Sequence, residues 1–124
     1  GLLVPLTARA TVADLAGRVG LPLLLVARPG LGTLNHTRLS LECLHRSRLP
    51  CHGVVINHTH RAPRQPMGRL AERTNPNVLR QWTRLGGELP FRPDLFRRST
   101  RSGRGLARWI AGHLDAQWLT SLVT

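Results

Sequence analysis

The segment from Leu21 to Thr37, LPLLLVARPGLGTLNHT, constrains the fold more than any other part of this sequence. Its apolar run ends at Pro29, passes through two glycines and continues in a helix-like pattern. The run lacks the alternation of a half-exposed strand, so we expect a strand covered on both faces, as in a parallel sheet. A helix that starts just after such a strand directs free N–H groups at the sheet's carboxyl edge. The sequence therefore predicts an anion site at this turn.

Strands and helices alternate along the rest of the chain. Thr11 and Asp14 have the spacing of a capping box, and Asn75 with Pro76 is typical of a helix start. We expect helices over 11–17, 35–46, 75–85 and 105–122, and strands over 1–6, 21–27, 53–57 and 88–90. This order predicts one α/β domain with a parallel sheet and flanking helices. The stripe of apolar residues in 105–122 is expected to dock on the sheet.

The charge of the chain is strongly positive, with eighteen basic residues, six acids and a formal net charge of +12. Every basic residue is arginine, so a phosphate-binding loop of the GxxxxGK[ST] kind cannot be built from this sequence. The arginines are dispersed and aromatic residues are few, which favours a solvated surface over a nucleic-acid interface. The dense segment 92–104 is interpreted as a charged connector before the last helix.

No apolar run approaches the ~20 residues that cross a bilayer, and no basic leader precedes the apolar residues at Gly1. We therefore expect a cytoplasmic protein without a membrane partner. Cys43 and Cys51 have no CxxC spacing and are expected to be buried or free thiols.

Conventional catalytic motifs are weak in this chain. His58 and His60 form a pair without a third ligand at a recognisable spacing, so we favour a solvated loop over a zinc site. The serines lack a GxSxG setting, and the six acids are dispersed. The chain is therefore not expected to be a self-contained hydrolase.

The turn formed by Gly32, Thr33, Leu34 and Asn35 is the strongest candidate site. A carboxylate on the free N–H groups of a helix start gains charge-assisted hydrogen bonds and a favourable dipole. Ordinary capping of the helix by Thr33 or Asn35 explains the same residues. Spacing alone leaves both interpretations open.

Several segments together resemble a known family. GLLVPL, TVADLAGRVGLPLLLVARPGLGTLNHT, GVVIN, TNPNVLR and GELPF occur in the order and approximate spacing of the C-terminal half of dethiobiotin synthetase, from Gly1 to about Phe91. The resemblance implies a P-loop NTPase-like fold. It also implies an ATP-dependent ligase of biotin biosynthesis that uses Mg²⁺ and CO₂ to close the ureido ring on 7,8-diaminononanoate.

The resemblance further implies two groups of ligand-contacting residues. The substrate carboxylate, reached across a homodimer interface, would be held by Gly32, Thr33, Leu34 and Asn35. The adenine ring of ATP would be contacted by Asn57, His58, Leu89, Pro90 and Phe91. Gly1 would follow the family's metal and phosphate segment.

The family's phosphate loop, its lysines and both magnesium-binding acids would lie before Gly1. We therefore expect no catalytic residue in this chain, no ATP hydrolysis by it alone, and an exposed apolar strand edge that lowers its solubility. A cobyrinate diamide synthase-like enzyme and an arginine-rich nucleic-acid-binding protein are the alternatives.

Overall fold

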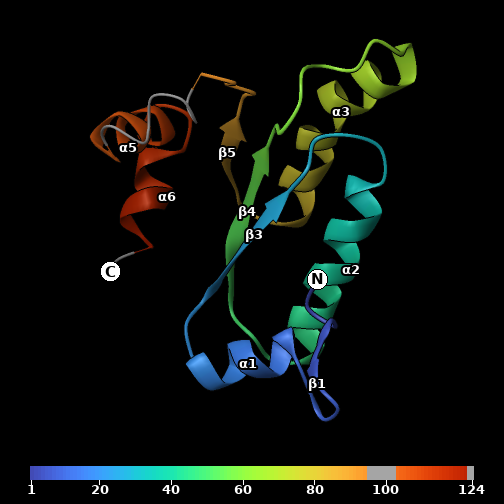
Figure 1. Ribbon diagram of the computed structural model, residues 1–124, viewed down its shortest axis with the longest axis vertical. Coiled ribbons are helices and arrows are strands. Elements are labelled where there is room, and N and C mark those ends of the chain that lie inside the picture. Colours follow the sequence, from blue (N-terminus) through green and yellow to red (C-terminus); the bar gives the residue numbers. More distant parts are fainter. Residues whose placement is uncertain (95–102, 123–124) are drawn as a thin grey trace.

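A computed structural model describes residues 1–94 and 103–122 of the chain (Figure 1). The strands are β1 (Pro5–Thr7), β2 (Ala10–Thr11), β3 (Leu23–Ala27), β4 (Cys51–Asn57) and β5 (Leu85–Leu89). The helices are α1 (Val12–Val19), α2 (Thr33–Arg46), α3 (Pro66–Trp82), α5 (Gly103–Ala111) and α6 (Ala116–Thr120). None of the helices in these two ranges is long and apolar enough to cross a membrane.

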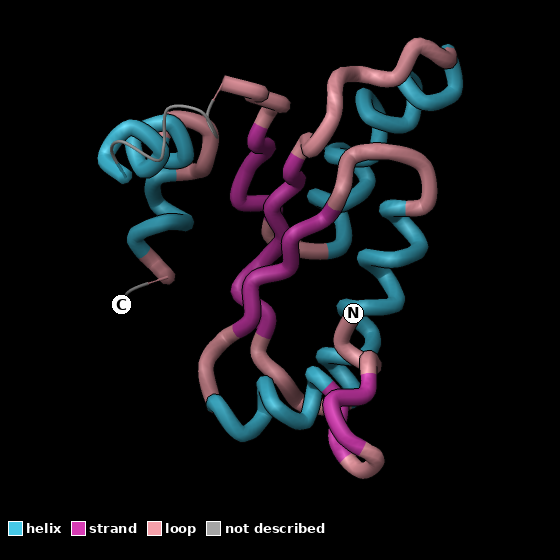
Figure 2. The backbone as a smooth tube through the Cα atoms, in the orientation of Figure 1, coloured by secondary structure: helices cyan, strands magenta, loops and turns pink. Residues whose placement is uncertain are grey.

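The central feature is a parallel sheet in the order β3-β4-β5, which confirms the predicted α/β class. Strands β1 and β2 form a separate antiparallel pair next to α1. Because the three central strands run in one direction, the loops that follow them leave the sheet at the same end (Figure 2). Residues that end the strands are therefore neighbours in space even when they are distant in sequence.

One face of the sheet carries α2 and α3 (Figure 1). Val54 and Ile56 of β4 are fully buried against Leu79 of α3. Leu25 of β3 and Leu34 of α2 pack on the same cluster. Alternate residues of the strands thus supply the core on this side, as the two-residue period of a strand requires.

The opposite face is covered over β4 and β5 by α6. Trp118 is completely buried there, and its Nε1–H donates to the carbonyl of His52 at 3.2 Å. Gly53 and Gly86 make room for the indole, since a Cβ atom on Gly86 would lie 2.5 Å from the ring. The two glycines therefore form the slot that anchors the C-terminal helix to the sheet.

Strand β3 lies at the edge of the described sheet, and its second face is open. Leu24 and Val26 are exposed, Val26 by 65%, whereas Leu25 between them is half-buried. The expectation of a strand covered on both faces is therefore wrong for this structure. An unbroken apolar run indicates which residues tolerate burial, but whether a partner covers them depends on the surrounding elements.

Helix α3 begins at Pro66, well before the predicted start at Asn75, and continues through Pro76 to Trp82. Asn75 does not cap the helix. Its buried side-chain amide donates to the carbonyl oxygens of Pro29 at 2.8 Å and Gly30 at 3.3 Å. Tertiary packing thus outweighs the hydrogen bond that Pro76 cannot donate within the helix. Leu85, predicted as the last residue of this helix, instead begins β5, which runs over Leu85–Leu89 rather than the predicted 88–90.

The predicted helix 105–122 is broken into α5 and α6. Between them, Leu114 forms an antiparallel bridge with Gly87, and the Asp115 N–H donates to the Gly86 carbonyl at 2.7 Å. The Asp115 carboxylate then accepts from the Trp118 N–H at 2.6 Å and caps α6. Pairing along the outer edge of β5 therefore interrupts the helix. Most of the predicted connector, residues 95–102, lies outside the described residues.

Helix α1 follows its predicted cap. The Thr11 side chain accepts from the Asp14 N–H at 3.3 Å, and the Asp14 carboxylate accepts from the Thr11 N–H at 2.7 Å. The helix extends past Gly17 to Val19, and Gly20 ends it with a positive φ of 72°. These local interactions account for the helix independently of the sheet.

Candidate functional site

A cavity of about 410 Å³ lies at the carboxyl ends of β4 and β5. Its walls come from separate parts of the sequence: the end of β4, the end of β5, and α5. The lining residues are Asn57, His58, Thr59, Leu89, Pro90, Phe91, Arg92, Pro93, Leu106, Trp109 and Ile110. All five residues that the family resemblance assigns to adenine therefore line one cavity.

Strand pairing explains how these residues meet. Asn57 is the last residue of β4 and pairs in register with Leu89, the last residue of β5. The His58 N–H then donates to the Leu89 carbonyl at 2.9 Å, which extends the ladder past both strands. Pro90 and Phe91 follow directly and turn over the cavity. The parallel register therefore places the Asn57 amide beside the Leu89–Phe91 turn.

The cavity combines apolar walls with few polar groups, as is common in small-molecule sites. The Asn57 side chain offers both donor N–H groups and an acceptor oxygen. Around it, Leu89, Pro90 and Phe91 supply apolar surface from one side of the cavity. This arrangement suits a flat heterocycle whose edge carries adjacent donor and acceptor atoms.

His58 and Arg92 line the cavity, and each lies near a carboxylate. His58 Nε2 lies 3.7 Å from a carboxylate oxygen of Glu88, and Arg80 approaches the other oxygen at 3.6 Å. Arg92 forms a two-point contact with Asp94 at 2.6 and 2.8 Å, and this hydrogen bonding raises the pKa of the Arg92 guanidinium. The Arg92 charge is thus already paired with a carboxylate.

Helix α5 contributes residues that the sequence analysis did not assign to a site. Leu106, Trp109 and Ile110 line the cavity opposite the strand ends, and Figure 1 shows α5 beside the upper end of β5. The spacing of Leu106 and Ile110 identified an apolar stripe. However, spacing does not specify the surface on which a stripe packs, so the contribution to the cavity was missed.

The turn before α2 is arranged differently. Gly32 precedes the helix with a φ of 86°, and no side chain caps the helix start. The interpretation of Thr33 or Asn35 as an ordinary cap is therefore wrong. The Thr33 N–H donates to the Gly30 carbonyl at 3.2 Å, but the Leu34 and Asn35 amides have no backbone partner in the described part of the chain. These amides remain available to an acceptor.

Asn75 holds this turn in place, whereas its sequence context predicts a helix start. Its two hydrogen bonds to Pro29 and Gly30 tie the loop after β3 to α3. The Asn–Pro pair was interpreted as a helix start, because that pattern is common there. A long-range side-chain contact of this kind leaves no local pattern in the sequence.

A smaller cavity of about 170 Å³ lies between β3 and α2. Thr33 lines it together with Arg28 and His36, whose side-chain nitrogens are 3.2 Å apart. Of the four residues predicted to bind a carboxylate, the other three do not line this cavity. Gly1 is exposed and lines neither cavity. The structure thus unites the predicted adenine residues but keeps the turn and Gly1 apart from them.

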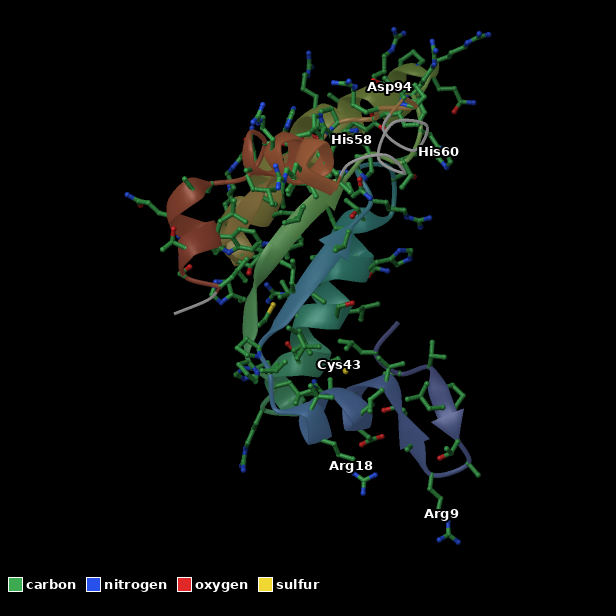
Figure 3. All side chains as sticks on the ribbon, turned by 60° about the vertical axis from the view of Figure 1, so that its left-hand side comes forward. Arg9, Arg18, Cys43, His58, His60 and Asp94 are labelled. Carbon is green, nitrogen blue, oxygen red and sulfur yellow. The ribbon has the colours of Figure 1, made fainter. Side chains whose placement is uncertain are left out.

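Metal-ligand chemistry is sparse in the described residues. Within 1–94 and 103–122, no group of three or more His, Cys, Asp or Glu side chains could hold a metal ion. His58 and His60 lie toward one end of the molecule together with Asp94, far from Arg9 and Arg18 (Figure 3). The described side chains therefore do not fit a magnesium ion.

Comparison with known proteins identifies a family and several relatives. A family model described as an AAA domain matches residues 1–99. An ATP-dependent dethiobiotin synthetase BioD from Anaeromyxobacter dehalogenans strain 2CP-C is 47% identical over 114 residues, which are 89% of this chain and 48% of that protein. The BioD of Thermodesulfovibrio yellowstonii is 38% identical over 104 residues, 77% of this chain and 42% of that protein.

The similarity extends beyond Phe91, where the resemblance was expected to fade. The chain nevertheless spans about half the length of the curated relatives it matches. The similarity therefore concerns one part of each relative.

Proposed function

Since the chain belongs to the AAA domain family and its curated homologues are ATP-dependent dethiobiotin synthetases, we propose that it recognises adenine and binds the substrate carboxylate in such an enzyme. The whole protein would act in the cytoplasm and close the ureido ring of dethiobiotin from 7,8-diaminononanoate, CO₂ and ATP. The names of the homologues favour this function over a cobyrinate diamide synthase or a nucleic-acid-binding protein.

The observation that carries the proposal is the cavity at the ends of β4 and β5. Asn57 lines it beside Leu89, Pro90 and Phe91, and its carboxamide can donate and accept together, as the edge of adenine requires. His58 borders the base beside the Glu88 carboxylate. A cavity formed by separate segments of one chain is expected to select the base without help from the rest of the enzyme.

The turn before α2 supports the second role. Its Leu34 and Asn35 amides lack backbone partners among the described residues, and the Asn35 side chain is exposed. A carboxylate would gain charge-assisted hydrogen bonds from these groups. We propose that Gly32, Thr33, Leu34 and Asn35 hold the 7,8-diaminononanoate carboxylate at the active site of a second subunit, in a homodimer.

The phosphate chemistry would be carried out elsewhere in the whole protein. This chain has no lysine, and Mg²⁺ would be held by acids outside it. Phosphoryl transfer depends on positioning and on charge neutralisation by metal, lysine and backbone N–H groups. The isolated chain is therefore expected to bind the base without turning ATP over, and Gly1 is expected to lie next to the phosphate segment.

Two measurements test the proposal. Adenosine binding to the chain, followed by calorimetry, should weaken about tenfold or more in Asn57→Ala, because a desolvated base edge loses its partners. Asn35→Ala should leave adenosine binding unchanged. In a full-length version the dependence should reverse for diaminononanoate, and equal losses for both ligands in both variants would contradict the separate roles.

A phosphate-release assay provides the complementary test. With Mg²⁺ and ATP, the purified chain should show no turnover above that of buffer. Magnesium-dependent release by this chain alone would refute the proposed division of roles.

A further inference from the structure

Trp109 is the least explained residue of the base cavity. Its ring lines the cavity with Leu106 and Ile110. Its Nε1–H is buried, and it has no hydrogen-bond partner in the described part of the chain. The buried Trp118 behaves in the opposite way, since its Nε1–H donates to the His52 carbonyl. One indole is therefore satisfied by the fold, and the other is left with an unused donor.

Trp109 contacts His113, which lies just after the end of α5. The His113 ring lies 4.8 Å from the indole ring, and His113 Nδ1 lies 2.8 Å from the Trp109 carbonyl oxygen. An N–H that is shielded from water and unpaired loses hydration without compensation. Indole nitrogen only donates, so any partner must be an acceptor. A ligand that enters the cavity lined by this ring is the natural source of that acceptor.

We propose that the Trp109 indole N–H donates a hydrogen bond to a ring nitrogen of the adenine base whose exocyclic edge is recognised by Asn57. The inference rests on the proposed function of the cavity. A carboxamide occupies the amino group and one adjacent ring nitrogen of adenine, which leaves other ring nitrogens as acceptors. Trp109 is thus a second residue that determines base specificity, and it lies on the helix facing the strand ends.

Deaza analogues identify the contact atom by atom. Adenosine and its 1-deaza, 3-deaza and 7-deaza analogues each differ by one ring acceptor, and calorimetry measures their binding to the chain. We expect Trp109→Phe, which keeps an aromatic ring, to weaken adenosine binding about tenfold, equivalent to about 1.4 kcal/mol. One analogue should bind the unsubstituted chain about tenfold more weakly than adenosine, and should lose nothing further in Trp109→Phe.

Two controls separate this contact from a structural effect. Trp82→Phe should leave binding unchanged, because Trp82 does not line the cavity. Asn57→Ala should still bind the analogue that identifies the Trp109 contact more weakly than it binds adenosine. This comparison does not require Trp109→Phe to fold. If Trp109→Phe has the same melting temperature as the unsubstituted chain, its weaker binding reflects a lost contact rather than a loss of folding.

The outcomes distinguish the two proposals. Unchanged adenosine binding in a folded Trp109→Phe, with a loss in Asn57→Ala, overturns the role of Trp109 and leaves the base site intact. The role of Trp109 is also overturned if Trp109→Phe weakens the binding of every analogue as much as it weakens the binding of adenosine. Absence of adenosine binding to the unsubstituted chain overturns the base site itself, and the role of Trp109 with it.

Discussion

The second face of the sheet has two regions that differ sharply. Over β4 and β5, α6 buries Trp118 in the slot formed by Gly53 and Gly86. Over β3, which pairs with β4 on the same sheet, Val26 is 65% exposed and no described element covers it. Apolar side chains therefore face the same direction in both regions, but only one region has the helix that covers them.

This difference separates what the chain does alone from what requires more protein. The base cavity draws on β4, β5 and α5, all within this chain. The turn before α2 follows the open strand β3, and its Leu34 and Asn35 amides have no backbone partner among residues 1–94 and 103–122. An uncovered strand edge is a pairing surface. We therefore expect base recognition to be independent of additional protein, and carboxylate binding to depend on it.

The largest effect is expected from removing the indole that closes the covered region. Trp118→Ala should lower the free energy of unfolding by about 3–5 kcal/mol, because it leaves a large cavity in the slot. Urea denaturation followed by circular dichroism measures this value. Adenosine binding should weaken as well, since α6 and α5 are joined through the segment paired with β5.

Trp82→Ala is the matched control for this prediction. Trp82 is 36% exposed and carries the Arg38 guanidinium 5.4 Å above its ring. Its removal should change the free energy of unfolding by about 1 kcal/mol or less. Equal effects of the two substitutions would show that α6 does not anchor the covered region.

A medium effect is expected at the open region, from the side chain that holds its turn. Asn75→Ala removes the donors to Pro29 and Gly30 and leaves their carbonyl oxygens without these partners. The free energy of unfolding should fall by about 1–3 kcal/mol. Hydrogen exchange should accelerate in the turn before α2 more than in β4. Asn77→Ala is the control, because Asn77 is exposed and its side chain accepts a hydrogen bond from its helix neighbour Arg80.

A small effect on stability, but a clear one on solubility, is expected from a charge on the open edge. Val26→Lys should change the free energy of unfolding by only about 0.5 kcal/mol, because this side chain already contacts solvent. Light scattering should show less self-association, since charged edges resist strand pairing. The neighbouring position in register, Val55, is 3% exposed, so Val55→Lys should lower the free energy of unfolding more than Val26→Lys does. If the folded Val26→Lys variant still self-associates, a surface other than the open edge is responsible.

Much of the fold was predictable because it depends on local chemistry. The capping box of α1 and the β-branched run of β4 specified these elements, and the order of strands and helices specified a parallel sheet. The errors arose where distant contacts decide. Asn75 binds a loop that is remote in sequence, and the segment around Leu114 leaves the helical pattern to pair with β5.

The candidate site shows the same limit. Asn57 and the Leu89–Phe91 turn were identified by resemblance, and strand register brings them together. Trp109 was not identified, because an apolar stripe with four-residue spacing indicates a buried helix face without naming the surface it meets. The exposure of Val26 was missed for a related reason. Burial depends on which elements are present around a strand.

The smallest effect is expected in α1, which lies away from both regions and so tests whether local helix stability influences either of them. The Asp14 carboxylate accepts hydrogen bonds from the backbone N–H and the hydroxyl of Thr11, and these bonds lower the pKa of the Asp14 carboxyl below its ordinary value of 3.8. A carboxyl whose pKa is lower in the folded state stabilises the fold above the ordinary pKa, and this contribution is lost as the pH falls through the folded value. Asp14→Asn should therefore slightly lower the urea midpoint at pH 7, and the difference from the unsubstituted chain should shrink below pH 3.8. Adenosine binding at pH 7 should be the same for both chains. A midpoint difference that persists in acid would mean that Asp14 acts through packing rather than through its charge, and altered adenosine binding would connect α1 to the covered region.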